Sequence, residues 1–403
     1  MSPNGSPDVQ AITRLVEEVK KCVEALALPD RRAALSSLRS AISVLEDPEE
    51  AAFAQIFQSP IYNFAIRMGV ELGIFRKLLE RNGTPVSAAD LAAECAAEEL
   101  LLVRIMRVLT AIGYAGESGE REYVASQLSK AMVVPYLEAF AVHSSEHSAR
   151  AAIRAPEYFK LHGYKTPVDS RNCPLQFALE TDLHFFDWIH RHPEKAKRFN
   201  VCMTGNKLRR REWFEWYPVA ECLLKPFERR NRNDSAFLVD MGGGKGRHLE
   251  ALMKSFPSTE SHLVLQDLPG TISSLENLSS GIRPMSHDIF SPQPVVGALA
   301  YYTHFVLHDF TDERCRVFLR AVASAMTPGY SRLLLNEAVI PERGCPPVFA
   351  TGDITMMLVL AGIQRSKRHW VELVESAGLR VVDVWVSPDD GDMEGVIEAE
   401  VAS

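Results

Sequence analysis

Long apolar runs are missing from this sequence of 403 residues, and none approaches the roughly 18 residues of a membrane-spanning helix. An excess of positive charge is missing too: the net charge of -8 gives no support to a bulk nucleic-acid or anionic-membrane partner. The seven cysteines have no paired short spacing, which indicates a reducing compartment and no zinc site. The stretch MSPNGSPDVQ lacks the features of a signal peptide, so we expect a cytoplasmic protein.

Several glycines follow an apolar run in the stretch FLVDMGGGKGRHL at 237–249. The run ends in Asp240, and a helical pattern begins after the glycines. Glycine removes Cβ atoms where the backbone bends sharply, and it lets a ligand approach main-chain N–H groups at a helix N-terminus. The pattern predicts a strand, a ligand-binding loop and a helix, with a plain turn that needs positive φ as the alternative.

The same loop has to be compared with the dinucleotide fingerprint, G-x-G-x-x-G with an acid about 20 residues later. Asp267 supplies the acid, but the spacing puts Arg247 in the place of the third glycine. A long side chain there obstructs close packing of the helix on the strand. The loop therefore disfavours NAD without excluding it.

The first part of the chain has mainly helical patterns, over residues 1–50 and again from a capping-box-like start at Ser87. The polar stretch GESGEREYV at 116–124 indicates a hairpin, so the region is winged-helix-like and a DNA-binding regulator is one alternative. The segment in the recognition-helix position has only Arg104 and Arg107 as basic residues, too few to read a DNA groove. We expect no nucleic-acid partner.

The segment 136–225 is rich in aromatic residues that could line an apolar pocket for a small molecule, with a simple packed core as the alternative. These residues are Phe185, Phe186, Trp188 and Phe199, joined by Met203. His143 and His147 have an i, i+4 spacing that a metal site can use. No H-E-x-x-H motif and no third ligand at a telling spacing accompany them, so we expect no metal.

From about residue 226 the pattern changes to alternating strands and helices. Apolar runs at 236–240, 262–266, 298–303 and 331–335 predict a parallel sheet covered by helices on both faces. The last two apolar runs, LRVVDVWV and GVIEAEV, are joined by a loop too short for a crossover helix and predict a terminal antiparallel hairpin. Ligands of such sheets bind at the carboxyl ends of the strands.

Acids occupy three of these strand ends: Asp240, Asp267 and Asp288. An acid after the second strand can accept both hydroxyls of a ribose, and an acid after the third can accept the amino group of an adenine. Helix capping or turn formation is the alternative for Asp267 and Asp288. Together with the glycine loop, the acids predict an adenosine-containing ligand.

His308 lies in YYTHFVLHDFTDERC, at the end of a predicted strand and before a helix that Thr311 is predicted to cap. A histidine can take a proton from a bound hydroxyl near neutral pH. Glu337, at the end of the next predicted strand, is placed to hold the other ring nitrogen and fix the tautomer. The pair predicts a general base, with a structural histidine as the alternative.

In order and spacing, a set of motifs resembles the S-adenosylmethionine-dependent O-methyltransferases of the caffeic-acid type, within them the fungal secondary-metabolite branch. The motifs are GVELGIF at 69–75, FNVCM at 199–203, VDMGGGKG at 239–246, LQDLP at 265–269, SHDIF at 286–290, LHDF at 307–310 and NEAVIP at 336–341. The resemblance implies a Rossmann-like class I methyltransferase domain at 226–403, a helical linker and substrate-pocket segment at 136–225, and a winged-helix-like dimerisation domain at 1–135. It therefore implies a homodimer.

The resemblance also implies the roles of individual residues. Those that would bind S-adenosylmethionine are Asp240, Gly242, Gly243, Gly244, Asp267, Leu268, Asp288, Ile289, Phe290 and His304. Those that would face the acceptor are Phe185, Phe199, Met203, Met356, Met357 and Gln364. His308 would deprotonate a hydroxyl of an aromatic or polyketide-like small molecule as it attacks the sulfonium methyl, and Glu337 would orient His308.

Two residues depart from the family pattern. His304 stands where plant relatives have a lysine that contacts the cofactor. Gln364, in AGIQRS at 361–366, stands where the family has a glutamate that also flanks the catalytic histidine, and an amide has no charge to stabilise an imidazolium. Two enzymes fit this pattern: a methyltransferase that relies on Glu337, and a relative that keeps the cofactor but catalyses a dehydration or a pericyclic rearrangement.

Overall fold

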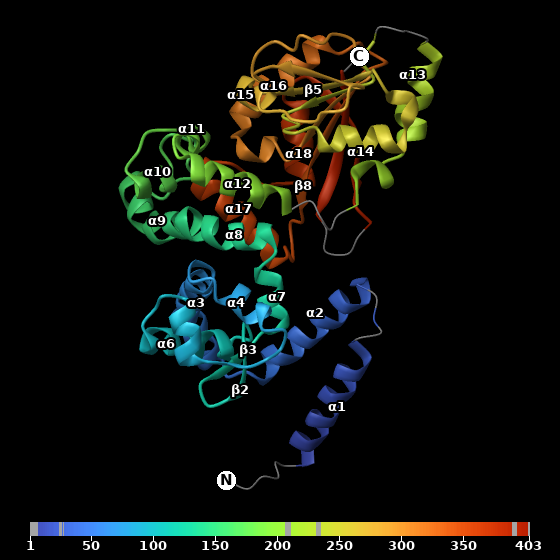
Figure 1. Cartoon of the computed structure of the whole chain (residues 1–403). Coiled ribbons are helices and arrows are strands. Elements are labelled where there is room, and N and C mark those ends of the chain that lie inside the picture. The colour runs from blue at the N-terminus through green and yellow to red at the C-terminus, as the bar shows by residue number, and fades with distance from the viewer. Residues whose placement is uncertain are drawn as a thin grey trace. The chain divides into compact units, whose positions relative to one another are not determined.

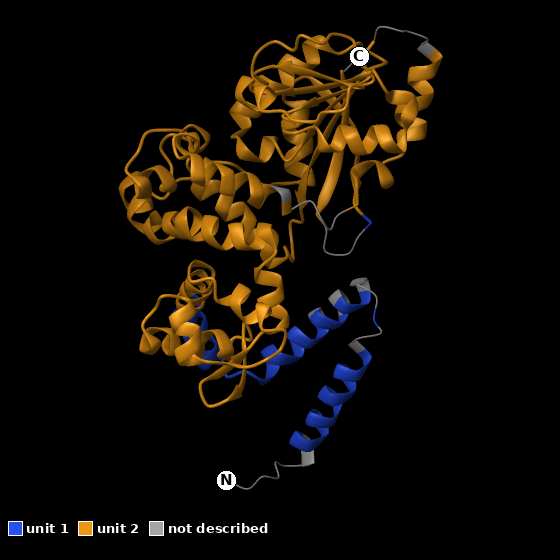
Figure 2. Cartoon of the chain, viewed as in Figure 1, with its two compact units in different colours: residues 1–59, 388–392 blue, residues 60–387, 393–403 orange. Residues whose placement is uncertain are grey.

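The computed structural model describes residues 7–23, 26, 28–205, 211–230, 235–388 and 393–401. The chain divides into two compact units, one of residues 1–59 with 388–392 and one of residues 60–387 with 393–403 (Figure 2). The domain boundaries predicted at residues 135 and 225 stay a prediction. Within the described residues, every helix is too short or too polar to cross a membrane.

Helices dominate the N-terminal part of the chain, as the apolar periodicity predicted. They are α1 (Pro7–Val23), α2 (Leu28–Leu45), α3 (Pro48–Glu71), α4 (Ile74–Glu80), α5 (Ala88–Glu94), α6 (Glu99–Ala111) and α7 (Gln127–Met132). A small antiparallel sheet has the order β1 (Val86–Ser87), β3 (Glu122–Val124), β2 (Gly116–Gly119), which confirms the predicted wing. The Ser87 side chain caps α5 by accepting a hydrogen bond from the backbone N–H of Asp90. Leu91, Met106 and Leu109 belong to the core of this part.

A second helical layer follows and receives one helix from much later in the chain. Its members are α8 (Pro135–Glu146), α9 (Ser148–His162), α10 (Pro174–Leu179), α11 (Phe185–His190), α12 (Pro193–Gly205) and the distant α17 (Pro347–Leu360). α17 packs against α9 and α10 and lies among these helices in Figure 1. The 3-10 helix η1 (Trp213–Glu215), the π-helix η2 (Ala220–Leu224) and α13 (Lys225–Arg230) lead from this layer to the large sheet.

The large sheet has the order β10-β11-β8-β7-β4-β5-β6, with β9 beside the end of β8. Its strands are β4 (Leu238–Met241), β5 (Leu263–Asp267), β6 (Ile282–Ser286), β7 (Ala300–His304), β8 (Arg332–Ile340), β9 (Arg365–Ser366), β10 (Leu379–Val386) and β11 (Glu394–Val401). β4 to β8 are parallel, whereas β10 and β11 form the predicted antiparallel hairpin and β11 joins β8. β4 therefore lies at the point where the strand order reverses, and ligands of such sheets bind there.

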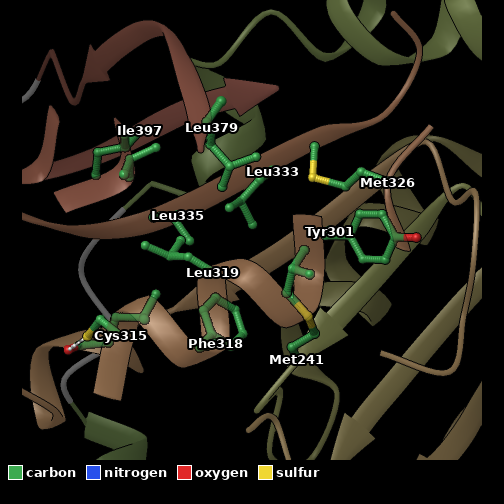
Figure 3. Close-up of a cluster of buried hydrophobic side chains, with 14 of the residues drawn as sticks. Met241, Tyr301, Cys315, Phe318, Leu319, Met326, Leu333, Leu335, Leu379 and Ile397 are labelled. Atoms are coloured by element: carbon green, nitrogen blue, oxygen red, sulfur yellow. Dashed lines mark hydrogen bonds between the residues drawn. The ribbon is translucent and has the colours of Figure 1, made fainter. Parts of the chain in front are cut away.

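Helices cover both faces of this sheet, so the strands are apolar on both sides. The helices and short turns between the strands are α14 (Arg247–Ser255), η3 (Pro257–Thr259), α15 (Pro269–Ser273), η4 (Leu307–Asp309), α16 (Asp312–Ala325) and α18 (Lys367–Glu375). Figure 3 shows one core, where Phe318 and Leu319 of α16 meet Tyr301 and Leu335 of neighbouring strands. The opposite face has a core of its own, to which Leu249 of α14 belongs.

Candidate active site at the carboxyl ends of the strands

The glycine loop after β4 has the backbone that its composition predicted. Gly242, Gly244 and Gly246 have φ angles of 77°, 61° and 78°, in the left-handed region that favours glycine. Gly243 has an ordinary φ, but a Cβ atom there would lie 2.5 Å from Oδ2 of Asp240. The loop can therefore pass directly over the buried Asp240 only because residue 243 has no side chain, and α14 begins immediately after it.

Asp267, at the end of β5, connects the loop to the neighbouring strand. Its Oδ2 accepts a hydrogen bond of 2.9 Å from the N–H of Gly244, and its Oδ1 accepts one of 2.8 Å from Leu268. Asp288 accepts from the N–H of Phe290 at 3.0 Å, which makes a turn after β6. Both acids thus form turns, and each retains further acceptor capacity on its carboxylate for a ligand at this edge.

His308 lies on η4, the 3-10 turn that follows β7, so its predicted place beyond a strand end is correct. Thr311 caps the next helix, α16, as predicted, by accepting from the N–H of Arg314. The His308 side chain is 15% exposed and therefore reaches the surface of the turn at one edge only. The turn and the glycine loop follow the adjacent strands β7 and β4, which places them at the same end of the sheet.

Both ring nitrogens of His308 have polar neighbours. The Gln364 amide nitrogen lies 3.0 Å from Nδ1, and Oδ1 of Asp309 lies 3.3 Å from Nε2. Burial, and then the positive charge of Arg365, lower the pKa of His308 to about 4, while the hydrogen bond with Gln364 acts in the opposite direction. The imidazole is therefore neutral near pH 7, as a proton acceptor has to be.

The prediction that Glu337 holds the His308 ring was wrong. Glu337 lies inside β8 instead of at its end, and its Oε1 accepts from the backbone N–H groups of Val306 and Leu307 at 2.9 and 2.7 Å. Burial raises the pKa of Glu337 to about 7 in spite of these bonds. The side chain supports the backbone of the His308 turn, and Gln364 is the residue that faces the ring.

Four of the six residues predicted for the acceptor belong to one apolar cluster of the helical layer. Phe199, Met356 and Met357 are half-buried against it, whereas Phe185 is 2% exposed and belongs to its core. Met203 is half-buried on α12. The end of α17 leads from Met356 directly to His308, because the N–H of Gly362 donates to the carbonyl of Met356 and the next residue donates to the carbonyl of His308.

His143 and His147 lie in the same aromatic cluster. Their ring centroids are 4.6 Å apart, and the His147 ring packs edge-on against Phe185 and Trp188. Burial lowers the pKa of His143 to about 4 and also lowers that of His147. Among the described residues, no group of three or more His, Cys, Asp or Glu side chains is arranged to hold a metal ion.

The side chain of His304, at the end of β7, belongs to a buried polar cluster with Glu394 and His248. Its Nε2 lies 3.3 Å from Oε1 of Glu394, and its ring centroid lies 4.3 Å from that of His248. His248 in turn bonds through Nδ1 to Glu212 at 2.9 Å. A contact between His304 and the cofactor stays a prediction.

Two residues beside His308 were missed by the sequence analysis. Asp309 follows it directly, and burial together with the nearby Glu337 raises its pKa well above the usual range. Arg365 is fully buried and donates to backbone carbonyls of the His308 turn. The motif LHDF contained the signal for Asp309, whereas Arg365 gave no signal because its partners lie more than 50 positions earlier in the sequence.

Two family models match this chain: an O-methyltransferase domain over residues 185–380 and an O-methyltransferase dimerisation domain over residues 54–135. O-methyltransferase penC of Penicillium thymicola is 36% identical over 92% of this chain and 91% of its own length. Demethylsterigmatocystin 6-O-methyltransferase of Aspergillus parasiticus is 32% identical over 81% of this chain and 83% of its own length.

Solved structures show the same fold. LepI in complex with S-adenosylmethionine (SAM) superposes with a TM-score of 0.86 at 24% identity, and the match covers 98% of this chain and all of that one. A structure described as a pericyclic reaction enzyme has the same TM-score at 25% identity and the same coverage. The likeness of fold thus extends to an enzyme of a pericyclic reaction.

The chain belongs to the SAM-dependent O-methyltransferases of fungal secondary metabolism. Its cofactor is S-adenosylmethionine. The site fits this group, because the glycine loop leaves open space at Gly244, where a Cβ atom would have no neighbour within 4 Å, and because the Asp267 carboxylate lies beside that opening. The winged part lies within the matched dimerisation domain of the family.

Proposed function

We propose that this enzyme transfers the methyl group of S-adenosylmethionine to a hydroxyl of an aromatic or polyketide-like small molecule, with His308 as the general base. The observation that carries the proposal is the position of His308: a neutral imidazole on the turn beside the glycine-loop edge, joined through residue 363 to the end of α17. One relative's name gives demethylsterigmatocystin as its acceptor, which supports a small-molecule hydroxyl.

When bound, the cofactor supplies an electrophilic methyl group on a positively charged sulfur. We propose that the glycine loop with Asp240 holds its methionine part, that Asp267 with Leu268 holds the ribose, and that the turn 288–290 holds the adenine. The N–H groups of the loop and the two carboxylates have the polarity that these parts require. Held in this way, the cofactor would lie at the same end of the sheet as the His308 turn.

The acceptor is proposed to lie between this turn and the apolar side chains of Phe199, Met203, Met356 and Met357. His308 takes the hydroxyl proton as the oxygen forms its bond to the methyl carbon, and the carbon–sulfur bond breaks with its electron pair going to sulfur. Positioning of the three reacting atoms supplies most of the rate enhancement, because effective molarities of well-oriented reactants are very large. The proton then leaves His308 for solvent at the exposed edge of the ring.

Radiolabelled S-adenosylmethionine and a panel of phenolic and polyketide-like acceptors test this proposal. We expect label in the product with the wild-type protein, and a loss of about 100- to 10,000-fold in kcat for His308→Ala. Binding of the cofactor, measured by calorimetry, should not change in this variant. Transfer at the wild-type rate by His308→Ala would overturn the assignment of the base.

Two observations favour a second function. An enzyme of a pericyclic reaction has the same fold, and the residue that contacts the His308 ring is the uncharged Gln364. Such an enzyme would keep the cofactor as a fixed cation and would convert a substrate by dehydration or rearrangement. Product formation without any S-adenosylhomocysteine would support this function. Strict one-to-one release of S-adenosylhomocysteine with product would exclude it.

We also propose a homodimer that forms through the N-terminal region. The matched dimerisation domain supports it, as do three exposed apolar side chains in this region: Ile61, Phe64 and Leu101 are 46%, 54% and 42% exposed. Apolar side chains of this size normally mark a contact surface when they gather on one region. Light scattering should give twice the 44.9 kDa chain mass, and a monomer would contradict the proposal.

A further inference from the structure

Two buried side chains, one carboxyl group and one guanidinium, hold the turn that carries His308. On one side, Glu337 accepts hydrogen bonds from the N–H groups of Val306 and Leu307. On the other side, Arg365 donates from Nη1 to the carbonyl of Leu307 at 3.1 Å and from Nη2 to the carbonyl of Phe310 at 2.8 Å. The carboxyl group thus meets backbone N–H groups of the turn, and the guanidinium meets its carbonyl groups.

Arg365 is wholly inside the protein and uses its guanidinium fully. Nε donates to Oδ1 of Asp312 at 2.9 Å, and the guanidinium lies over the Trp370 ring, 4.9 Å from its centroid. His369 donates to the other oxygen of the same carboxylate at 2.8 Å. A buried cation is costly unless it is paired and hydrogen-bonded. Besides the carboxylate and the two carbonyls of the His308 turn, the guanidinium donates to the carbonyl of Ile363 and to the sulfur of Cys315.

The segment before Arg365 lies against the same turn. A Cβ atom on Gly362 would lie 2.3 Å from the carbonyl oxygen of His308, so the two backbones touch. The N–H of Ile363 donates to that oxygen at 2.9 Å, and Gln364 faces the ring. Residues 362–365 therefore contact the ring of His308 and three carbonyls of its turn.

We propose that Arg365 is a positioning residue of methyl transfer, which fixes the backbone of the turn 307–310 so that the His308 ring meets the acceptor hydroxyl in one place. This inference rests on the proposed role of His308 as base. The planar guanidinium can hold two carbonyls and a carboxylate at once, whereas a lysine ammonium is a single point of charge. Small displacements of a reacting group cost up to about 100-fold in rate.

The charge of Arg365 has a second effect on the ring. It lowers the pKa of His308, after burial, and so favours the neutral imidazole. The other charged or titratable groups near the ring are Asp309 on the turn itself and Glu337 of β8, while Asp312 balances the guanidinium from the start of α16. Removal of the Arg365 charge should therefore move the His308 titration to higher pH.

Arg365→Met and Arg365→Lys test the inference, with Arg368→Met as a matched control because Arg368, in the first turn of the following helix α18, is 74% exposed. We expect kcat to fall about 10- to 100-fold in Arg365→Met, with the calorimetric Kd for S-adenosylmethionine within about twofold of wild type. The kcat of Arg365→Lys should fall too, because lysine keeps the positive charge but lacks the planar set of donors of a guanidinium. Arg368→Met should behave as wild type.

A second measurement does not depend on turnover. Histidines labelled with 13C at Cε1 report each ring by NMR, and the His308 signal is assigned by its loss in His308→Gln. We expect the His308 titration to move to higher pH in Arg365→Met and to stay in place in Arg368→Met. If the Met variant does not fold, the kcat of Arg365→Lys decides.

The two readouts separate the two proposals. Wild-type kcat in a folded Arg365→Met, or in Arg365→Lys, would overturn the positioning role. If the wild-type protein methylates none of the acceptors, the proposed function fails, and the NMR titration then decides whether Arg365 controls the His308 ring. An unchanged titration in Arg365→Met would overturn the inference in that case.

Discussion

The amide of Gln364 lies 3.0 Å from Nδ1 of His308 and holds the ring with an uncharged group. The orientation of this amide decides the tautomer. With the NH2 group toward the ring, Nδ1 accepts and the ring proton is on Nε2; with the oxygen toward the ring, Nδ1 carries the proton and Nε2 can accept one. Only the second arrangement lets Nε2 act as a base.

Gln364→Glu should favour this second arrangement, because a carboxylate can only accept from Nδ1. The new charge stabilises the imidazolium, so the pKa of His308 should rise from about 4 and the rate of transfer should increase about tenfold. The pH profile of kcat/KM measures this, because its acid limb follows the protonation of the base and should move to higher pH.

Gln364→Met is the control for this exchange. It removes the hydrogen bond that raises the pKa of His308, so its acid limb should move to lower pH and its rate should fall. Identical profiles for wild type and both variants would show that residue 364 does not act on the base.

Asp267→Asn should weaken the binding of the cofactor without changing the rate of the chemical step. The Asp267 carboxylate accepts from Gly244 and Leu268 and is proposed to accept from the ribose hydroxyls as well. A hydrogen bond to a charged group is worth about 1.5–3 kcal/mol, which corresponds to a 10- to 100-fold increase in Kd. Calorimetry with S-adenosylhomocysteine measures it, and kcat at saturating cofactor should stay near the wild-type value. An unchanged Kd would remove Asp267 from the cofactor site.

Gly243→Ala should damage the loop itself. The added methyl group would lie 2.5 Å from both Oδ2 of Asp240 and Cδ1 of Leu265, and both of these side chains are buried. Overpacking of this kind costs about 1–3 kcal/mol of unfolding free energy, and we expect cofactor affinity to fall with it. Thermal melting and calorimetry measure the two effects.

Gly270→Ala is the matched control, because a Cβ atom at Gly270 has no neighbour within 4 Å and its φ is not positive. It should leave the cofactor Kd unchanged and should not lower the melting temperature, since alanine is the better helix former. Equal behaviour of the two variants would contradict the close packing at Gly243.

The sequence predicted those features that depend on residues close together in the chain. The glycine loop, the caps at Ser87 and Thr311 and the terminal hairpin follow from spacing and residue type alone. The strand before Asp288, β6, was inferred from that acid and not from an apolar run, because it is the edge strand and only one of its five residues is buried.

Contacts between distant segments were not predictable in the same way. Glu337 was expected at the end of its strand. In the structure β8 continues to Ile340, where it pairs with β11 and β9, and the sequence pattern did not show this pairing. Arg365 lies within AGIQRS, a segment that resembles a family motif, but nothing in that segment indicated its carbonyl partners, which are more than 50 positions away in the sequence. The sequence thus indicated His308 and Gln364, whereas the places of Asp309 and Arg365 and the direction of Glu337 depended on contacts between distant segments.

Glu337→Gln should change how stability depends on pH. Burial raises the pKa of Glu337 from 4.5 to about 7, so between these values the folded protein holds a proton that the unfolded chain has released. The unfolding free energy of the wild type should therefore fall as pH rises through this window and become level above it. The shift corresponds to a change on the order of 3 kcal/mol, which a glutamine at this position cannot contribute.

Urea unfolding of wild type and Glu337→Gln between pH 4.5 and 8, at one protein concentration, measures this difference. The unfolding free energy of the wild type, relative to that of the variant, should decrease on the order of 3 kcal/mol from the acid end of this range to about pH 7. Glu342→Gln, on the exposed surface, is the control for replacing a glutamate by a glutamine. The backbone N–H groups of Val306 and Leu307 can donate to the amide oxygen of glutamine, so the turn should survive. A constant difference across the range would mean that Glu337 keeps its charge in the folded protein, and His308 would then have a carboxylate at its turn at every pH.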